Sequence, residues 1–169
     1  MVSLLLGPSK VFLNTEQFLI QLEQWRASVE PRLALLSAAE LEHSVPGEWS
    51  LLDKLAHLAA WDAEAVLALA RAKQGGKPRY LNITPAETDE LNAQWHGENK
   101  GRASERVLGD FHGVWRQLVR QLHGFAPADL EDTKRYPWLK GVALIDFVDE
   151  WALQHEMEHL QHLLARPPE

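Results

Sequence analysis

Two histidines near the end of the chain, His155 and His159, have a spacing that suits a metal site. Helical residues four apart lie about 40° apart around the axis and about 6 Å apart along it, so both rings can reach one divalent ion. Leu144, Val148 and Ala152 share their side of the predicted helix, which turns the rings toward the core. Two interpretations remain open at this point. The pair has a metal or catalytic role, or each ring hydrogen-bonds to a backbone carbonyl or a carboxylate.

Residues 155–159 also match the H-E-x-x-H motif of zinc metalloproteases. We reject that interpretation because such proteases take a third ligand further downstream, and only ten residues follow His159. The elongated form of the motif requires a glycine, and residues 160–166 contain none. A third ligand must therefore come from an upstream part of the chain.

His57 is the leading upstream candidate, and His112 is its competitor. In the helix predicted around His57, the densest apolar face lies on one side. His57 lies on a different side, together with Trp61. A helical wheel therefore leaves open whether His57 faces solvent or the wall of a pocket. His112 lies near the apolar face of its own helix, and His162 follows His159 by one turn as a neighbour of the site or an alternative ligand. Three others are expected to be surface residues: His43, His96 and His123.

Acidic and aromatic side chains near these histidines have two interpretations each. Glu156 and Glu158 are either proton acceptors or partners of the imidazoles, or they form a solvated flank, which we favour. Trp61, Trp138 and Trp151 either line an apolar pocket or pack in the core and loops, and packing is favoured for each one singly. No catalytic residue is assigned from the sequence.

Four long amphipathic helices must position these residues. Their apolar periodicity predicts helices over about residues 15–36, 50–73, 104–122 and 143–165, and no strand alternation is evident. Pro31 is expected to kink or restart the first helix, and Ser50 with Asp53 forms an approximate capping box for the second. The connection over residues 79–102 carries a short extra helix that begins at Thr84 and Pro85. This order predicts an all-α fold, a four-helix bundle with a long crossover between its second and third helices.

Composition limits the classes of function. The chain has 169 residues and no cysteine, which suits a single domain over residues 1–169 and excludes disulfides and cysteine nucleophiles. Its net charge is -7 with no basic run, so we expect no nucleic-acid partner. Charges interrupt the apolar stretches, so we expect no membrane span, and the apolar run at residues 4–6 is too brief for a signal peptide. A cytoplasmic protein is the resulting expectation.

Residues 49–61, followed about a hundred residues later by His155 and His159, resemble the DinB/YfiT-like superfamily. Residues 92–95 and 135–138 are similar to its ClbS/DfsB-like branch. The resemblance implies an up-down four-helix bundle with a divalent metal, zinc, nickel or iron, held by His57, His155 and His159. This sequence departs from the family pattern at Lys54, where an apolar residue is expected, and at His162, where relatives often have glutamine.

Relatives in that superfamily include thiol-dependent isomerases and transferases, and the ClbS-like branch includes hydrolases of strained electrophiles. The resemblance therefore implies a metal-dependent enzyme that acts on small electrophilic molecules by hydrolysis or thiol transfer. Because the chain lacks cysteine, a thiol nucleophile must be a low-molecular-weight co-substrate. Two alternatives are a binding protein that sequesters a small molecule without turnover, and a metal-free dimerising bundle. The apolar helix faces also permit a homodimer.

Overall fold

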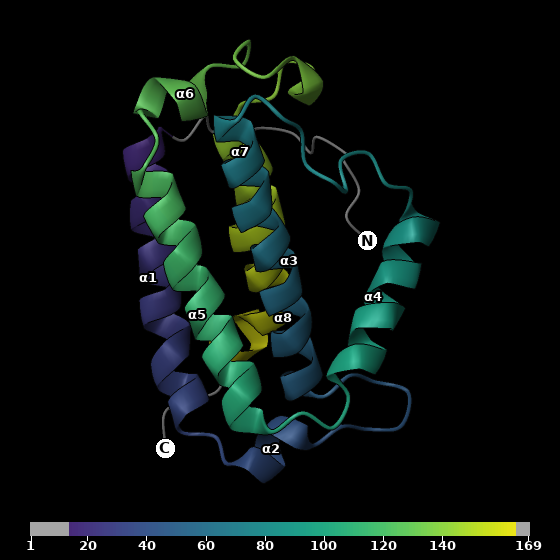
Figure 1. Ribbon diagram of the computed structural model, residues 1–169. Helices are drawn as coiled ribbons and strands as arrows, with labels where there is room; N and C mark the ends of the chain where they lie inside the picture. Colours follow the sequence, from purple (N-terminus) through teal and green to yellow (C-terminus); the bar gives the residue numbers. More distant parts are fainter. Residues whose placement is uncertain (1–13, 165–169) are drawn as a thin grey trace.

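The computed structural model describes residues 14–164, and these are helical with no strand among them (Figure 1). The expectation for residues 4–6 and the predicted helix end at residue 165 lie outside this range. Within residues 14–164, no helix combines the length and apolar character that crossing a membrane demands.

Long helical segments follow the predicted ones closely. They are α1 (Thr15–Ala34), α3 (Leu51–Lys73), α5 (Ser104–His123) and a final segment of α7 (Leu144–Val148), η2 (Asp149–Gln154) and α8 (His155–Leu164). Shorter elements connect them: α2 (Ala38–Glu42), α4 (Pro85–Asn99), α6 (Pro127–Glu131) and η1 (Pro137–Leu139). The extra helix of the crossover, α4, has 15 residues and is longer than expected.

Side-chain caps explain where the main helices begin. The Ser50 hydroxyl accepts a hydrogen bond from the Asp53 backbone N–H at 3.0 Å, and the Asp53 carboxylate accepts one from the Ser50 backbone N–H at 3.0 Å. This reciprocal box satisfies two backbone donors that a helix start leaves unpaired. Thr84 and Glu87 form the same box at the start of α4. The sequence signals at Ser50 and Thr84 were therefore correct.

The first helix does not restart at Pro31, because α1 continues through it to Ala34. Pro31 lies in the last turn, where the missing N–H costs one hydrogen bond near a helix end that frays in any case. The chain is then held by the Leu35 N–H, which donates to the Arg32 carbonyl at 3.3 Å.

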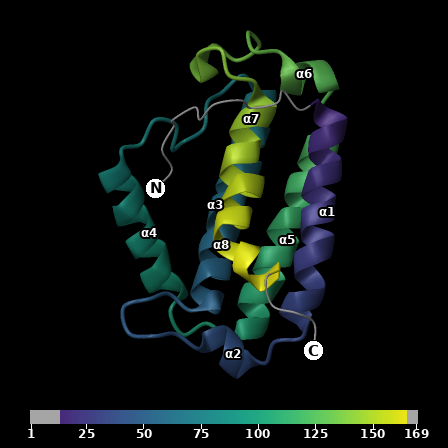
Figure 2. The ribbon, with the colours of Figure 1, turned by 180° about the vertical axis from the view of Figure 1, so that it is seen from behind.

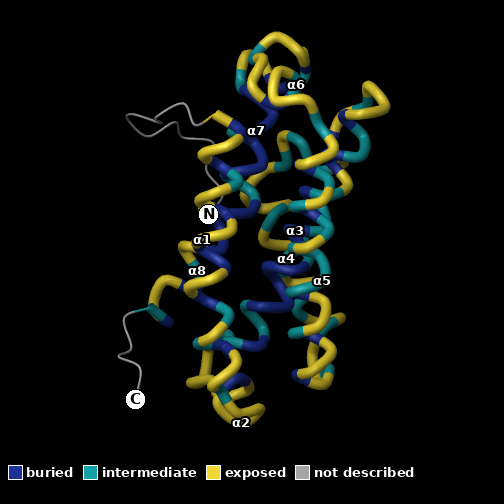
Figure 3. The backbone as a smooth tube through the Cα atoms, turned by 90° about the vertical axis from the view of Figure 1, so that its left-hand side faces the viewer, coloured by how far each residue is buried: buried dark blue, intermediate teal, exposed yellow. Residues whose placement is uncertain are grey.

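The long segments lie side by side, with α1 and α7–α8 running downward and α3 and α5 upward in Figure 1. The same arrangement is seen from behind in Figure 2. Along the chain, α4 follows α3 and runs back to the lower end in Figure 1, where α5 begins. Helices α3 and α5 are therefore parallel. Buried positions recur along each long helix (Figure 3), as expected when one face of a helix lies in a core. Large buried side chains of this core are Phe18, Leu22, Leu55, Leu69, Phe111, Leu118 and Leu160.

Helix α4 stands apart from that core and has no buried residue. Its contacts with α3 are made by polar and aromatic side chains. The Trp61 indole N–H donates to the Asn92 side-chain oxygen at 3.0 Å, and the Trp61 and Trp95 rings meet edge to face at 5.3 Å. His96 lies 3.4 Å from the Asp53 carboxylate. Helix α4 therefore covers one side of α3 without contributing to the apolar interior.

Candidate metal centre

Three imidazoles from two helices meet between α3 and α8. His57 comes from α3, and His155 and His159 come from successive turns of α8. Each ring offers a nitrogen within 4.8 Å of the other two, and the Nε2 atoms of His57 and His155 are 3.0 Å apart. His57 and His155 are buried, and His159 is half-buried. The structure thus brings together the three residues named from the family resemblance.

Local structure explains how the rings reach one point. The Ser50 cap begins α3 at Leu51, which places His57 about two turns into the helix. On the other side, η2 is a π-helix that ends directly before His155. It holds an extra residue relative to an α-helix, a feature often found at functional sites. The His155 ring hydrogen-bonds to the backbone of Trp151 in this segment, which fixes its orientation.

The environment keeps all three rings neutral. Burial, followed by the proximity of His159, lowers the pKa of His57 to about 3. Burial followed by the proximity of His57 and His159 lowers the pKa of His155 to about 3. Burial and the charge of Lys54 lower the pKa of His159. Desolvation disfavours the charged form of a base, so each ring keeps one unprotonated nitrogen, with a free lone pair, at neutral pH.

These donors fit a divalent metal ion. Neutral imidazole nitrogen is a good ligand for zinc, nickel and iron. Two ligands about 2.0–2.1 Å from a tetrahedral ion lie about 3.3 Å apart, close to the 3.0 Å between the Nε2 atoms of His57 and His155. The Nδ1 atom of His57 is buried without a hydrogen-bond partner. The two Nε2 atoms can share one hydrogen bond, with either ring as the donor, or both can bind the same cation through their lone pairs.

A cavity of about 380 Å³, which we call the triad cavity, opens beside the three histidines. Helix α4 supplies one wall through Thr88, Asp89 and Asn92, and Glu158 lies on the α8 side. The triad is thus accessible to a small molecule, and α4 covers it.

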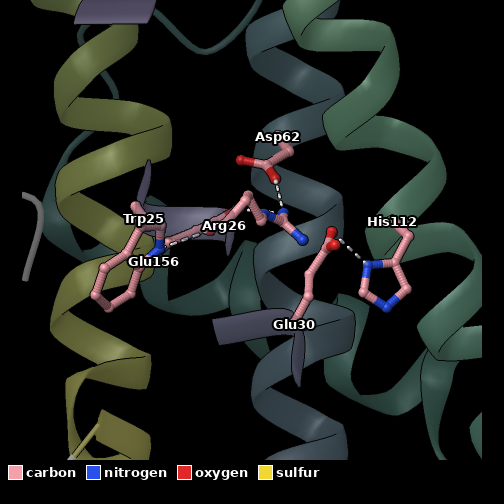
Figure 4. Close-up of polar contacts among 6 residues, drawn as sticks. All are labelled: Trp25, Arg26, Glu30, Asp62, His112 and Glu156. Atoms are coloured by element: carbon pink, nitrogen blue, oxygen red, sulfur yellow. Dashed lines mark hydrogen bonds and ion pairs between the residues drawn. The ribbon is translucent and has the colours of Figure 1, made fainter. Parts of the chain in front are cut away.

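None of the other described histidines belongs to the triad. The competitor His112, on α5, does not join the triad and pairs instead with Glu30 of α1 at 3.2 Å (Figure 4). His162 is exposed and lines a separate hollow near the end of α8. His96 is not a plain surface residue, because it stacks on Trp49 at 4.9 Å between ring centroids. Its position one turn after Asn92 on α4 is the sequence signal that could have placed it near the triad.

The expectation of a solvated flank is wrong for Glu156, which is 1% exposed. Its carboxylate binds the Arg26 guanidinium and accepts a hydrogen bond from the Trp25 indole at 3.0 Å (Figure 4). Asp62 lies 3.6 Å from Arg26, and burial together with the Glu156 charge raises the pKa of Asp62 well above its usual value. This network joins α1, α3 and α8, and its Glu156 directly follows His155 in the sequence. Sequence reasoning missed Arg26, although its spacing from Leu22 on α1 marks a buried position.

Among solved structures, the crystal structure of the colibactin self-resistance protein ClbS in complex with a double-stranded DNA has the same fold. The TM-score is 0.78 at 12% sequence identity, and the match covers 95% of this chain and 100% of that one. No curated protein matches the sequence.

This likeness corrects the expectation that nucleic acid is excluded as a partner, because a protein of this fold is crystallised with DNA. That expectation rested on the net charge of the whole chain, -7, and on the absence of a basic run along the sequence. Net charge is a sum over the entire surface and does not describe the local face that meets a partner.

A family comparison covers most of the described chain. Residues 21–163 match the DinB superfamily, and this range includes the helices that carry all three histidines of the triad. The chain belongs to the DinB superfamily.

Proposed function

We propose that this chain is a metal-dependent enzyme that acts on small electrophilic molecules by hydrolysis or thiol transfer. In this proposal His57, His155 and His159 hold a divalent ion, zinc, nickel or iron, between α3 and α8, and the four long helical segments form a four-helix bundle. The observation that carries the proposal is the convergence of three neutral imidazoles beside an accessible cavity. Membership of the DinB superfamily supports it.

The chemistry follows from the donor set. A divalent ion bound by three neutral ligands keeps its positive charge and acts as a Lewis acid toward a water or thiol. The chain's own residues hold the site in place. His155 is oriented by the backbone of Trp151, and the Arg26–Glu156 pair anchors α8 against α1. Glu158 lines the triad cavity, and in this proposal its carboxylate accepts a proton from the nucleophile.

The nucleophile must come from outside the chain. No cysteine is present, so a thiol reaction uses a low-molecular-weight co-substrate, and hydrolysis uses water. The walls of the triad cavity contain Trp49 and Trp61, which limit the water around the histidines. Either nucleophile would meet the electrophile within this cavity.

Metal binding is the first test. Metal-free protein is titrated with zinc, nickel and iron(II) by isothermal calorimetry, and one equivalent is expected to bind. His57→Gln and His159→Gln should each weaken zinc binding by about 100-fold or more, because each removes a ligand. His123→Gln, at an exposed position on α5, is the matched control and should bind as the unmodified protein does. If none of the three metals binds stoichiometrically, the proposal is refuted.

A second candidate is a protein that sequesters a reactive small molecule without turnover. The shared fold with a self-resistance protein favours it as the alternative. The two are separated by counting products per protein when metal-loaded protein meets excess styrene oxide, with and without a low-molecular-weight thiol. Many products per protein support the enzyme, whereas a stop at one equivalent supports sequestration.

A further inference from the structure

A second cavity adjoins the triad and is lined by aromatic rings. It has a volume of about 260 Å³. We call it the aromatic chamber and define it by five side chains: Trp61, Tyr80, Trp138, Phe147 and Trp151. They come from α3, the start of the crossover, η1, α7 and η2, so the chamber gathers residues from distant parts of the sequence.

The aromatic chamber and the triad cavity share three lining residues, Trp61, Thr88 and His155. Because His155 belongs to both, a molecule in the aromatic chamber lies directly against one ring of the triad. Each cavity alone is at or near the lower limit of the 300–1,000 Å³ typical of ligand sites, and the two together lie within that range. The two cavities therefore adjoin across Trp61, Thr88 and His155.

Contacts between the rings hold the chamber walls in fixed positions. Trp61 and Trp151 meet edge to face at 5.2 Å, and Phe147 and Trp151 are 4.5 Å apart at an angle of 38°. Trp138 meets Phe147 at 6.3 Å and 85°. These are favourable aromatic geometries, and the hydrogen bond from Trp61 to Asn92 restrains a further wall. Rigid walls of this kind bind a flat partner at a small entropic cost.

The chemistry of the lining selects an apolar partner. Aliphatic side chains complete the walls between the rings: Leu81, Ile83, Leu139 and Val142. The charged groups on the lining are of both signs, Lys140 and Glu150, and leave no net charge that would select an ion. The triad cavity differs, because its lining combines three imidazoles with Asp89, Asn92 and Glu158. One compartment thus suits a planar hydrocarbon and the other a polar, reactive group.

We infer that the substrate is a two-part molecule: a flat, apolar ring system binds in the aromatic chamber and places a polar electrophilic group in the triad cavity. The second half of this inference rests on the proposed function, whereas the binding of the ring system depends only on the chamber. Trp138 is a specificity-determining residue in this arrangement, since it forms a wall of the chamber and touches neither the triad nor its cavity.

Three probes test the inference by calorimetry. Acetohydroxamate carries only a metal-binding group, 2-naphthylmethanol carries only a flat ring system, and 2-naphthohydroxamate carries both. Zinc-loaded protein should bind 2-naphthohydroxamate at least about 10-fold more tightly than acetohydroxamate, because only the former fills the chamber. Equal affinity for the two hydroxamates would overturn the inference while leaving the metal site intact.

Variants locate the effect. Trp138→Ala should remove most of the naphthyl advantage and leave acetohydroxamate binding unchanged. Phe125→Ala is the matched control, since Phe125 is a half-buried ring that lines neither cavity, and it should preserve the advantage. An unchanged ratio of affinities in Trp138→Ala would refute the assignment of the chamber.

Two further arms keep the test decisive. Thr88 lies on α4, which has no buried residue, and lines both cavities. The substitution Thr88→Phe should therefore fill the junction between the compartments without disturbing the core. It should retain 2-naphthylmethanol and lose the advantage of 2-naphthohydroxamate, and a retained advantage would contradict a joined site. If the protein binds no metal, the proposed function fails, but binding of 2-naphthylmethanol that Trp138→Ala abolishes would still support the chamber.

Discussion

Mild acid should destabilise the metal-free protein through two buried histidines. The pKa of His57 and of His155 is lowered to about 3 by burial, whereas an unfolded histidine has a pKa of about 6.5. Between these pH values the unfolded chain binds protons at both histidines, whereas the folded chain does not. Acid therefore stabilises the unfolded state and lowers the free energy of unfolding. The free energy of unfolding is not reduced by these two histidines above about pH 6.5. It falls progressively as the pH decreases from there toward about 3.

The size of the loss follows from this difference in pKa. At pH 5, an unfolded histidine with a pKa of about 6.5 gains about 2 kcal/mol from protonation, and the buried ring gains almost nothing. His57 and His155 together therefore lower the free energy of unfolding by about 4 kcal/mol between pH 7.5 and pH 5. That is a large part of the 5–15 kcal/mol by which a domain of this kind is usually stable.

Urea unfolding followed by circular dichroism, with a chelator present, measures the effect at pH 7.5, 6.5, 5.5 and 5.0. The double variant His57→Gln/His155→Gln should lose most of the pH dependence, because neither glutamine titrates. His123→Gln, on the exposed side of α5, should keep it. If the double variant and the unmodified protein lose stability in parallel between pH 6.5 and 5.0, the argument from the buried rings is refuted.

Two substitutions test the elements that support the site. Arg26→Met leaves the buried Glu156 carboxylate without its cation and should cost about 3–5 kcal/mol in urea unfolding. Exposed Arg120→Met is its control, and a loss below about 1 kcal/mol at Arg26 would contradict the role of the pair. Ser50→Ala removes the cap of α3 and should cost about 1 kcal/mol, seen as a lower thermal midpoint. Thr84→Ala removes the same cap from α4 and should leave the global midpoint nearly unchanged, so equal shifts would count against this reasoning.

Local signals in the sequence were sufficient to locate the main helices. A capping box such as that of Ser50 and Asp53 acts within four residues, so it can be recognised without knowledge of the fold. The same holds for His155 and His159, whose shared face follows from the helical repeat alone. His57 could not be paired with them in this way, because their proximity depends on how α3 packs against α8. The sequence left His57 and His112 open as upstream candidates, and the family resemblance selected His57. Metal binding by the three residues stays a prediction.

The features that were missed all depend on tertiary structure. A helical wheel assumes 3.6 residues per turn, and η2 departs from that assumption by holding an extra residue just before His155. Glu156 was expected in solvent because carboxylates are seldom buried, yet Arg26 and Trp25 supply partners for it in the core. The partner of a buried charge lies on another helix, about 130 residues away in this case. Sequence periodicity carries no information on such a pairing.

Because α4 has no buried residue, it covers the site while remaining nearly independent of the folding core. A segment of this kind can open locally at a small fraction of the free energy of global unfolding, and its amide hydrogens should exchange early. Substitutions along α4 can therefore alter which molecules reach the histidines without endangering the rest of the molecule. Evolution can change the selectivity of such a protein through this one helix and keep the interior, with its ligands, as it is.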